Sequence, residues 1–258
     1  MKKEIGRLLI EIQQEADCCQ ILFPAVPAGH AGRHRIRKKR KLGDKMKTNS
    51  KTRKMSLFAM FLAIELMLVL TPIGYIRLPG LSITMMHIPV IAAGILLGWK
   101  YGAALGLVFG LTSIWNATMQ PGPTSFVFSP FVTIAGISGN WTSLIIALVP
   151  RILLGAIAGW LFEAFVIKAK MNTPLAACLA AVLATFCHTF MVLGLIYLLW
   201  GGQYASAIGS APEALLGLLA MVVVTNGLAE MALAGVVCMA LVKAIKPSVI
   251  AKMSVSKA

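Results

Sequence analysis

Polar side chains inside long apolar segments are the residues of this sequence that could do chemistry. A charged or hydrogen-bonding group in apolar surroundings is expensive, so it usually faces a cavity or pairs with another polar group. Ten such residues lie within the apolar segments: Glu65, His87, Thr112, Ser113, Asn116, Arg151, Glu163, His188, Asn226 and Glu230. We take them as candidates for binding a solute or for joining helices.

Arg151 has the clearest chemistry among them. It follows Trp141, the first residue of a predicted helix, by ten residues. That distance is about 15 Å along a helix axis, near the middle of a bilayer. A guanidinium at that depth needs an anionic partner and suits bidentate contact with a carboxylate. Two partners fit: the carboxylate of a bound substrate, or a carboxylate of the protein itself, at Glu65 or Glu230.

Other polar and amphipathic residues could line a pocket with Arg151. Asparagine side chains can hydrogen-bond a polar ligand, and tryptophans supply amphipathic walls. The predicted substrate-binding residues are Arg151, Asn140, Asn116, Trp115, Thr112 and Asn226. Each has a structural alternative, since tryptophans at helix ends anchor at the membrane interface and intramembrane asparagines often bond a neighbouring helix. For His188 we expect a bond between helices.

The sequence lacks the motifs that several kinds of metal, redox and ATP-dependent chemistry require. The five cysteines include no CxxC pair, so neither a zinc site nor a redox function is predicted, and we expect no cofactor. The sequence contains no GxxxxGK[ST] loop, no HExxH and no aspartate after Asp44. ATP hydrolysis by this chain is therefore not predicted.

Two alternative functions stay open. The segment from Gly136 to Gly139 has the GxSG form, and His188 follows on a later helix, as in an intramembrane serine protease. Nothing in the spacing orients His188 toward Ser138. The other alternative is a secondary carrier that transports a vitamin-like solute without other subunits.

The composition indicates a protein dissolved in lipid. Hydrophobic residues make up 58% of the chain, charged residues 13%, and the mean hydropathy is +0.82. The net charge of +15 is concentrated at the start, because 15 of the 24 Lys and Arg residues precede Met55. We interpret this basic stretch as a cytoplasmic anchor for anionic lipid headgroups rather than as a nucleic-acid-binding segment.

The predicted fold class is all-α, a polytopic bundle of about six membrane helices. The predicted helices are Met55 to Ile73, Met86 to Trp99, Tyr101 to Thr118, Trp141 to Phe165, Thr173 to Trp200 and Pro212 to Ala244. The second is short for a full crossing and forms a tight hairpin with the third, turning at Lys100. Residues 1–54 form a basic extension, 55–246 the membrane domain and 247–258 a tail; Met46 and Met55 are alternative start sites.

Positive charge orients the predicted bundle, because Lys and Arg near helix ends stay in the cytoplasm. Four places are rich in Lys or Arg: the segment before Met55, the turn at Lys100, the break after Phe165 and the C-terminus. The other three breaks hold only Arg77, no charge, and Glu213. We therefore predict both termini inside and a solute-binding mouth outside, in the cell membrane.

Small residues and turn residues complete the pattern. Five glycines recur at every fourth position from Gly94 to Gly110, and Gly155 and Gly159 repeat the spacing, which predicts close helix packing. Ala59 and Ala63 form a smooth stripe that fits either internal packing or another membrane subunit. Pro and Gly in the breaks at 71–82 and 120–140 predict shaped outer loops, the second suited to a lid.

Four segments together resemble the substrate-specific components of energy-coupling factor (ECF) transporters. They are TPIGYIRLPG from Thr71, HIPVIAAGILLGWKYGAALGLVFGLTS from His87, TSFVFSP from Thr124 and GNWTSLIIALVPRILLG from Gly139. The resemblance covers Met55 to about Lys246 and is greatest to pantothenate-type members.

This resemblance implies a small binding protein that captures a vitamin from outside and passes it across by toppling within a complex. The implied partners are a transmembrane coupling subunit and two ATPase subunits on separate chains. In this family the coupling subunit docks on AxxxA alanines of the first helix, a pattern that Ala59 and Ala63 match. A carboxylate vitamin such as pantothenate would give Arg151 its partner.

Overall fold

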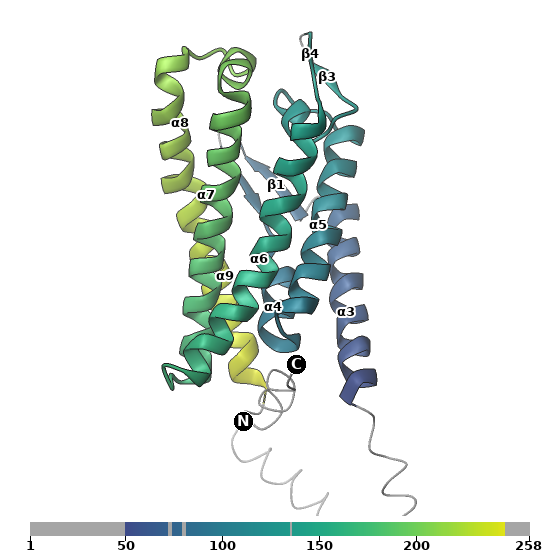
Figure 1. The fold of residues 1–258 in the computed structure, drawn as a ribbon, viewed down its shortest axis with the longest axis vertical. Helices are drawn as coiled ribbons and strands as arrows, with labels where there is room; N and C mark the ends of the chain where they lie inside the picture. Colours follow the sequence, from purple (N-terminus) through teal and green to yellow (C-terminus); the bar gives the residue numbers. More distant parts are fainter. Residues whose placement is uncertain (1–49, 72–73, 79–80, 135, 246–258) are drawn as a thin grey trace, which may run out of the picture. The chain divides into compact units, whose positions relative to one another are not determined.

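The computed structural model describes residues 50–71, 74–78, 81–134 and 136–245, and these residues form a helical bundle (Figure 1). Its helices are α3 (Ser50–Leu70), α4 (His87–Leu97), α5 (Trp99–Met119), α6 (Trp141–Ile167) and α7 (Thr173–Ala207). The last segment consists of η3 (Pro212–Ala214), α8 (Leu215–Val222), the π-helical turn η4 (Val223–Gly227) and α9 (Leu228–Ala244). Most of the predicted extension and all of the predicted tail lie outside the described residues.

Among the residues that the structure describes, four segments are long and apolar enough to cross a membrane. They are Trp99–Met119, Trp141–Ile167, Thr173–Ala207 and Pro212–Ala244, with hydropathies from 1.2 to 2.2. Large apolar side chains on their outer faces, such as Phe190, Leu198 and Val236, are exposed, as contact with lipid tails requires. The prediction of an all-helical membrane fold is confirmed for the described residues, apart from two short hairpins.

Helix α4 lies at the centre of the bundle. All of its residues are buried, and it packs against α3, α5, α6 and α9. Its 11 residues span about 16 Å, which is too short for a full crossing. The predicted hairpin with α5 exists, but the predicted turn at Lys100 is wrong by two residues. The chain turns at Gly98, whose φ of +101° suits glycine, and Lys100 already belongs to the first turn of α5.

The predicted close packing of glycines is confirmed. The backbones of α5 and α6 meet at Gly102 and Gly155, where a Cβ on either glycine would overlap the carbonyl oxygen of the other. A Cβ on Gly94 of α4 would lie 2.5 Å from the same Gly155 oxygen. These three helices therefore approach as closely as backbones allow, which makes the wall that carries Arg151 rigid.

The breaks predicted as shaped loops contain short antiparallel hairpins. Strand β1 (Tyr75–Leu78) pairs with β2 (Leu81–Thr84), and β3 (Thr133–Ile134) pairs with β4 (Ile137–Ser138) after the 3₁₀ turn η2 (Ser125–Val127). Figure 1 shows β3 and β4 at one end of the bundle, whereas β1 lies at mid-height. Strand β2 packs against η4 and α9, so this hairpin reaches into the bundle.

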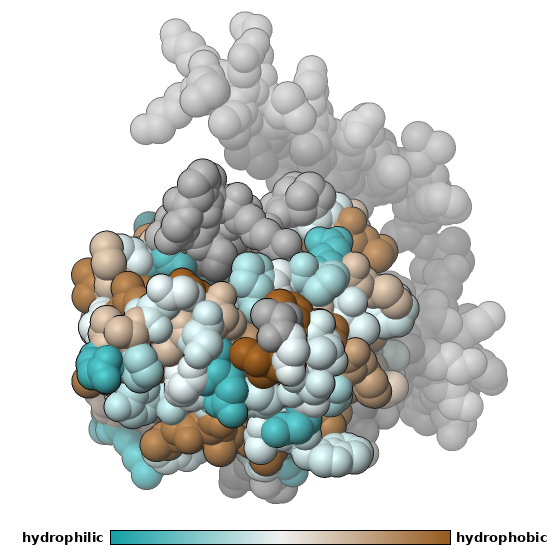
Figure 2. All heavy atoms as spheres, turned by 90° about the horizontal axis from the view of Figure 1, so that it is seen from above, coloured by the Kyte–Doolittle hydropathy of each residue, from teal (hydrophilic) through white to brown (hydrophobic). Residues whose placement is uncertain are grey.

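The loop from η2 to β4 is packed onto the ends of α6 and α7. Phe126 is fully buried, its ring centroid lies 5.2 Å from that of Trp200, and its carbonyl accepts a 2.7 Å hydrogen bond from Ser143. Figure 2 shows this end of the bundle as a mixed surface, with hydrophilic residues beside hydrophobic ones. The exposed Trp141 and Phe131 are typical of anchors at a membrane interface.

Candidate functional site

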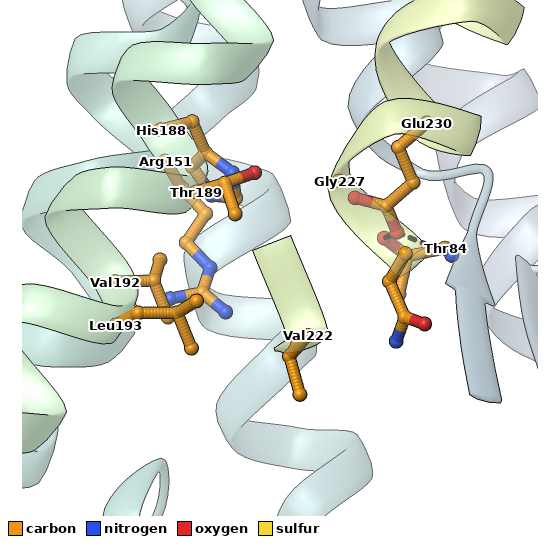
Figure 3. A pocket seen from close by; sticks show the side chains of 10 residues that line it. Thr84, Arg151, His188, Thr189, Val192, Leu193, Val222, Gly227 and Glu230 are labelled. Atoms are coloured by element: carbon orange, nitrogen blue, oxygen red, sulfur yellow. Dashed lines mark hydrogen bonds between the residues drawn. The ribbon is translucent and has the colours of Figure 1, made fainter. Parts of the chain in front are cut away.

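Polar residues from five elements meet in one pocket of about 160 Å³. Its polar lining consists of Thr84 of β2, Arg151 of α6, His188 and Thr189 of α7, Asn226 of η4 and Glu230 of α9. Valine and leucine side chains of α7 and α8 form the apolar part. Figure 3 shows Arg151 and His188 on one side of the pocket and Thr84 and Glu230 on the other. The arrangement offers hydrogen-bonding groups of both kinds to a small solute.

Arg151 is held in place by its own helix and by two aromatic rings. Its guanidinium carbon lies 5.1 Å from the ring centroid of Phe128 and 5.7 Å from that of Phe109. Both distances are within the range of cation–π attraction. Its Nη1 donates a 2.5 Å hydrogen bond to the carbonyl of Ile146. These contacts hold the guanidinium at the pocket, which Arg151 lines.

The preceding residue explains why the Ile146 carbonyl accepts this bond. In a regular helix that carbonyl would accept from the backbone N–H of residue 150, but Pro150 has none. The carbonyl would then lack a partner inside an apolar bundle, which costs free energy. The Arg151 side chain supplies the donor. The Pro-Arg pair therefore both satisfies the helix and orients the guanidinium.

Glu230 faces the pocket from the opposite side and is tied to β2. Its Oε1 accepts a 2.8 Å hydrogen bond from the backbone N–H of Thr84 and a 2.7 Å bond from the Thr84 hydroxyl. Residues 84 and 230 are 146 positions apart in the sequence. This contact therefore joins the β1–β2 hairpin to α9 and makes both part of one wall.

The wall between α8 and α9 is a π-helical turn that carries Asn226. A π turn inserts one extra residue into the helix and frequently marks a functional site. Within η4, Gly227 is buried, and Asn226 is a lining residue of the pocket. Helix α9 follows this turn directly and carries Glu230.

Two histidines lie near the charged residues of the pocket, His188 near Arg151 and His87 near Glu230. The ring of His188 is 6.4 Å from that of Phe109, and His188 interacts electrostatically with both Arg151 and His87. His87 is buried at the start of α4, where neither ring nitrogen has a hydrogen-bond partner among the described residues. Only His188 lines the pocket.

The predicted site residues divide into two groups. Arg151 and Asn226 lie together in the pocket, whereas the other four do not line it. Asn140 caps α6 by accepting bonds from the backbone and hydroxyl of Thr142. The hydroxyl of Thr112 donates to the carbonyl of Phe109 over 2.9 Å. On α5, which also carries Thr112, Trp115 is exposed and Asn116 is half-buried.

Of the two protein carboxylates considered as partners of Arg151, Glu230 lines the pocket with it and Glu65 does not. Glu65 is fully buried in α3, and its oxygens accept no hydrogen bond from any residue that the structure describes. Glu230 is hydrogen-bonded to Thr84.

The structure does not assemble the predicted protease dyad. The hydroxyl of Ser138, in β4, shares a 3.0 Å hydrogen bond with Thr133, and Ser138 is exposed. His188 lies in the pocket with Arg151 instead. The two alanines of the predicted docking stripe, Ala59 and Ala63, are exposed on α3.

Four polar lining residues are not among the predicted substrate-binding residues: Thr84, His188, Thr189 and Glu230. Glu230 was recognised as a deep polar residue but was considered only as an ion-pair partner for Arg151. Thr84 lies in a break between predicted helices, where the sequence does not indicate how deep a residue lies in the membrane. Polarity inside an apolar segment, which did identify Glu230 and His188 as general candidates, could also have identified Thr189.

The sequence is similar to one protein family and to two named proteins. Residues 53–242 match the family described as "ECF transporter, substrate-specific component". The pantothenic acid transporter PanT of Lactococcus lactis subsp. cremoris (strain MG1363) is 36% identical over 199 residues, which cover 76% of this chain and 95% of that protein. The pantothenate transporter PanT of Leuconostoc mesenteroides subsp. mesenteroides is 35% identical over 123 residues, or 45% of this chain and 53% of that protein.

Proposed function

The chain belongs to the family of ECF transporter substrate-specific components and is a membrane-spanning transport protein of the cell membrane. From that membership we propose that it captures pantothenate. The names of its two relatives support the substrate. The observation that carries the proposal is the guanidinium of Arg151, held over two aromatic rings at a pocket deep in the bundle. Pantothenate has one carboxylate, which a guanidinium binds through two parallel hydrogen bonds.

Uptake in this proposal requires other chains. Family membership implies a transmembrane coupling subunit and two ATPase subunits, and the absence of a phosphate-binding loop from the sequence agrees with ATP hydrolysis on separate chains. The coupling subunit docks on α3, where Ala59 and Ala63 are exposed. The chain itself acts as a binding protein and not as an enzyme.

The proposed topology has six helical segments with both termini in the cytoplasm. Its support is the charge pattern of the sequence and the course of the helices. Helix α3 begins and α9 ends at the same end of the bundle, as Figure 1 shows, and the β3–β4 hairpin lies at the other. In this arrangement α3 and the short α4 complete the six segments, and the pocket opens to the outside. Ser50 to Lys54, predicted as the end of the basic extension, already belong to α3, and the proposal keeps the basic residues before Met55 on the cytoplasmic side.

Calorimetry on the purified full-length chain tests the proposed function. We expect wild-type protein to bind pantothenate more tightly than panthenol, its neutral alcohol analogue. Arg151→Gln should lower the affinity for pantothenate by about tenfold to a hundredfold, because a hydrogen-bonded charge contact is lost. Panthenol binding should change little. No binding of pantothenate by the wild type, or equal losses for both compounds, would contradict the proposal.

A transport assay separates this function from a stand-alone carrier. In vesicles, uptake of labelled pantothenate should require the coupling subunit, both ATPases and ATP. Uptake by vesicles that contain this chain alone would instead support the carrier alternative.

A further inference from the structure

The pocket wall opposite Arg151 presents a hydrogen-bond acceptor. Both bonds from Thr84 end on Oε1 of Glu230, and Oε2 takes part in no hydrogen bond with the described residues. Glu230 lines the pocket. In Figure 3 one carboxylate oxygen of Glu230 faces Thr84 and the other points toward the side of the pocket where Arg151 lies. One oxygen therefore fixes the side chain and the other is directed at the space a ligand would fill.

The two sides of the pocket have opposite hydrogen-bonding character. Arg151 can only donate, and an ionised Glu230 can only accept. A ligand that satisfies both must carry a carboxylate at one end and neutral donors, hydroxyl or amide N–H, toward the other. Pantothenate has this distribution, because its two hydroxyl groups lie at the end of the molecule away from its carboxylate.

We propose that Glu230 is a substrate-binding residue, which accepts hydrogen bonds from the hydroxyl end of the substrate while Arg151 holds the carboxylate. This inference rests on the proposed function and adds to it the orientation of the substrate and the residue that selects its far end. Thr84 is the positioning residue, because its two hydrogen bonds aim the Glu230 carboxylate.

Substrate selection follows from the charge of Glu230. A ligand without donors leaves the carboxylate desolvated and unmatched, which costs more than a missing favourable contact. A second carboxylate at the far end of a ligand would be repelled by Glu230. The pocket therefore selects hydroxylated monocarboxylic acids against both apolar acylated amino acids and dicarboxylates.

A cycle of two ligands and two proteins tests the direct contact. The ligands are pantothenate and N-(3,3-dimethylbutanoyl)-β-alanine, which keeps the carboxylate and the amide but lacks both hydroxyls. Calorimetry on the full-length wild type and on Glu230→Ala should show that the substitution lowers the affinity for pantothenate by about tenfold or more. The analogue should lose less than about twofold, because it makes no hydroxyl contact.

Two further variants keep the test independent of folding. Glu230→Gln preserves the shape of the side chain and should give a smaller loss, again confined to pantothenate. Glu213→Gln changes an exposed glutamate of η3 outside the pocket and should leave both affinities unchanged. Thermal melts of each variant show whether the bundle is intact, and the Gln variant decides if the Ala variant does not fold.

The outcomes separate this inference from the proposed function. Wild-type protein that binds neither compound would overturn the proposed function and this inference with it. Wild-type protein that binds pantothenate, combined with Glu230 variants that weaken both ligands equally or neither ligand, would overturn the inference alone. A loss confined to pantothenate supports it.

Discussion

A single proline determines how Arg151 is presented. Pro150 leaves the carbonyl of Ile146 without its helical donor, and the guanidinium takes that place. The bond anchors one edge of the guanidinium, while Phe109 and Phe128 restrict its tilt. A side chain ordered before the ligand arrives loses less conformational entropy on binding. The sequence Val149-Pro-Arg151 therefore acts as one functional unit.

Replacing this proline should reduce affinity without reducing stability. Pro150→Ala gives residue 150 a backbone N–H, which then competes with Nη1 of Arg151 for the carbonyl of Ile146. We expect a melting temperature no lower than that of the wild type. Pantothenate affinity should fall by about threefold to tenfold, the effect of one modest hydrogen bond.

The matched control is Pro174→Ala. Pro174 lies in the first turn of α7, where a missing N–H leaves no helical carbonyl without a donor. That variant should leave both the melting temperature and the affinity close to wild type. An affinity for Pro150→Ala equal to that of the wild type would show that the Ile146 bond does not orient Arg151.

At the scale of the elements, α4, α5 and α6 form a core in which glycine is required for steric reasons. The contact of Gly102 with Gly155 leaves no space for a methyl group on either side. Both neighbours there are backbone atoms, which cannot move aside as a flexible side chain can. This packing places α6, and with it Arg151, against α5.

A methyl group at this contact should destabilise the bundle. Gly102→Ala must push α5 away from α6, and overpacking of this kind costs about 1–3 kcal/mol or more. Thermal unfolding of the purified protein should show a lower melting temperature. Gly194→Ala is the control, because nothing lies within 4 Å of a Cβ there, and helix propensity favours alanine. Equal melting temperatures for the two variants would contradict the proposed close packing.

The helices were predictable because lipid leaves the backbone of an apolar segment no other partner. The exact position of the Gly98 turn and the two hairpins could not be predicted as well, because Pro and Gly indicate a turn without giving the register of the strands. The contact of Thr84 with Glu230 joins residues 146 positions apart, and no local pattern encodes such a pair. Asn140 shows the opposite case: Asn140 and Ser143 precede an apolar helix and form a capping box, a local pattern that sequence reasoning interpreted as a binding residue.

At the scale of the whole molecule, the proposed binding site and the proposed docking face lie on different elements. The described lining of the pocket comes from β2, α6, α7, α8, η4 and α9, and the alanine stripe lies on α3, which is not among them. The stripe residues Ala59 and Ala63 are exposed. They stand beside exposed apolar residues such as Met60, Ile64 and Met67. A change on this face should therefore affect assembly without affecting ligand affinity.

The double variant Ala59→Leu/Ala63→Leu tests this separation. Two bulky side chains would prevent the close helix approach that small residues permit. We expect loss of copurification with the coupling subunit and loss of ATP-driven pantothenate uptake in vesicles, while calorimetry on the isolated chain gives wild-type affinity. Ala59→Ser/Ala63→Ser keeps both side chains small at the same positions and should retain assembly. If the leucine variant still assembles and transports, the docking face lies elsewhere; if it also loses ligand binding, α3 supports the pocket and the two functions are not separate.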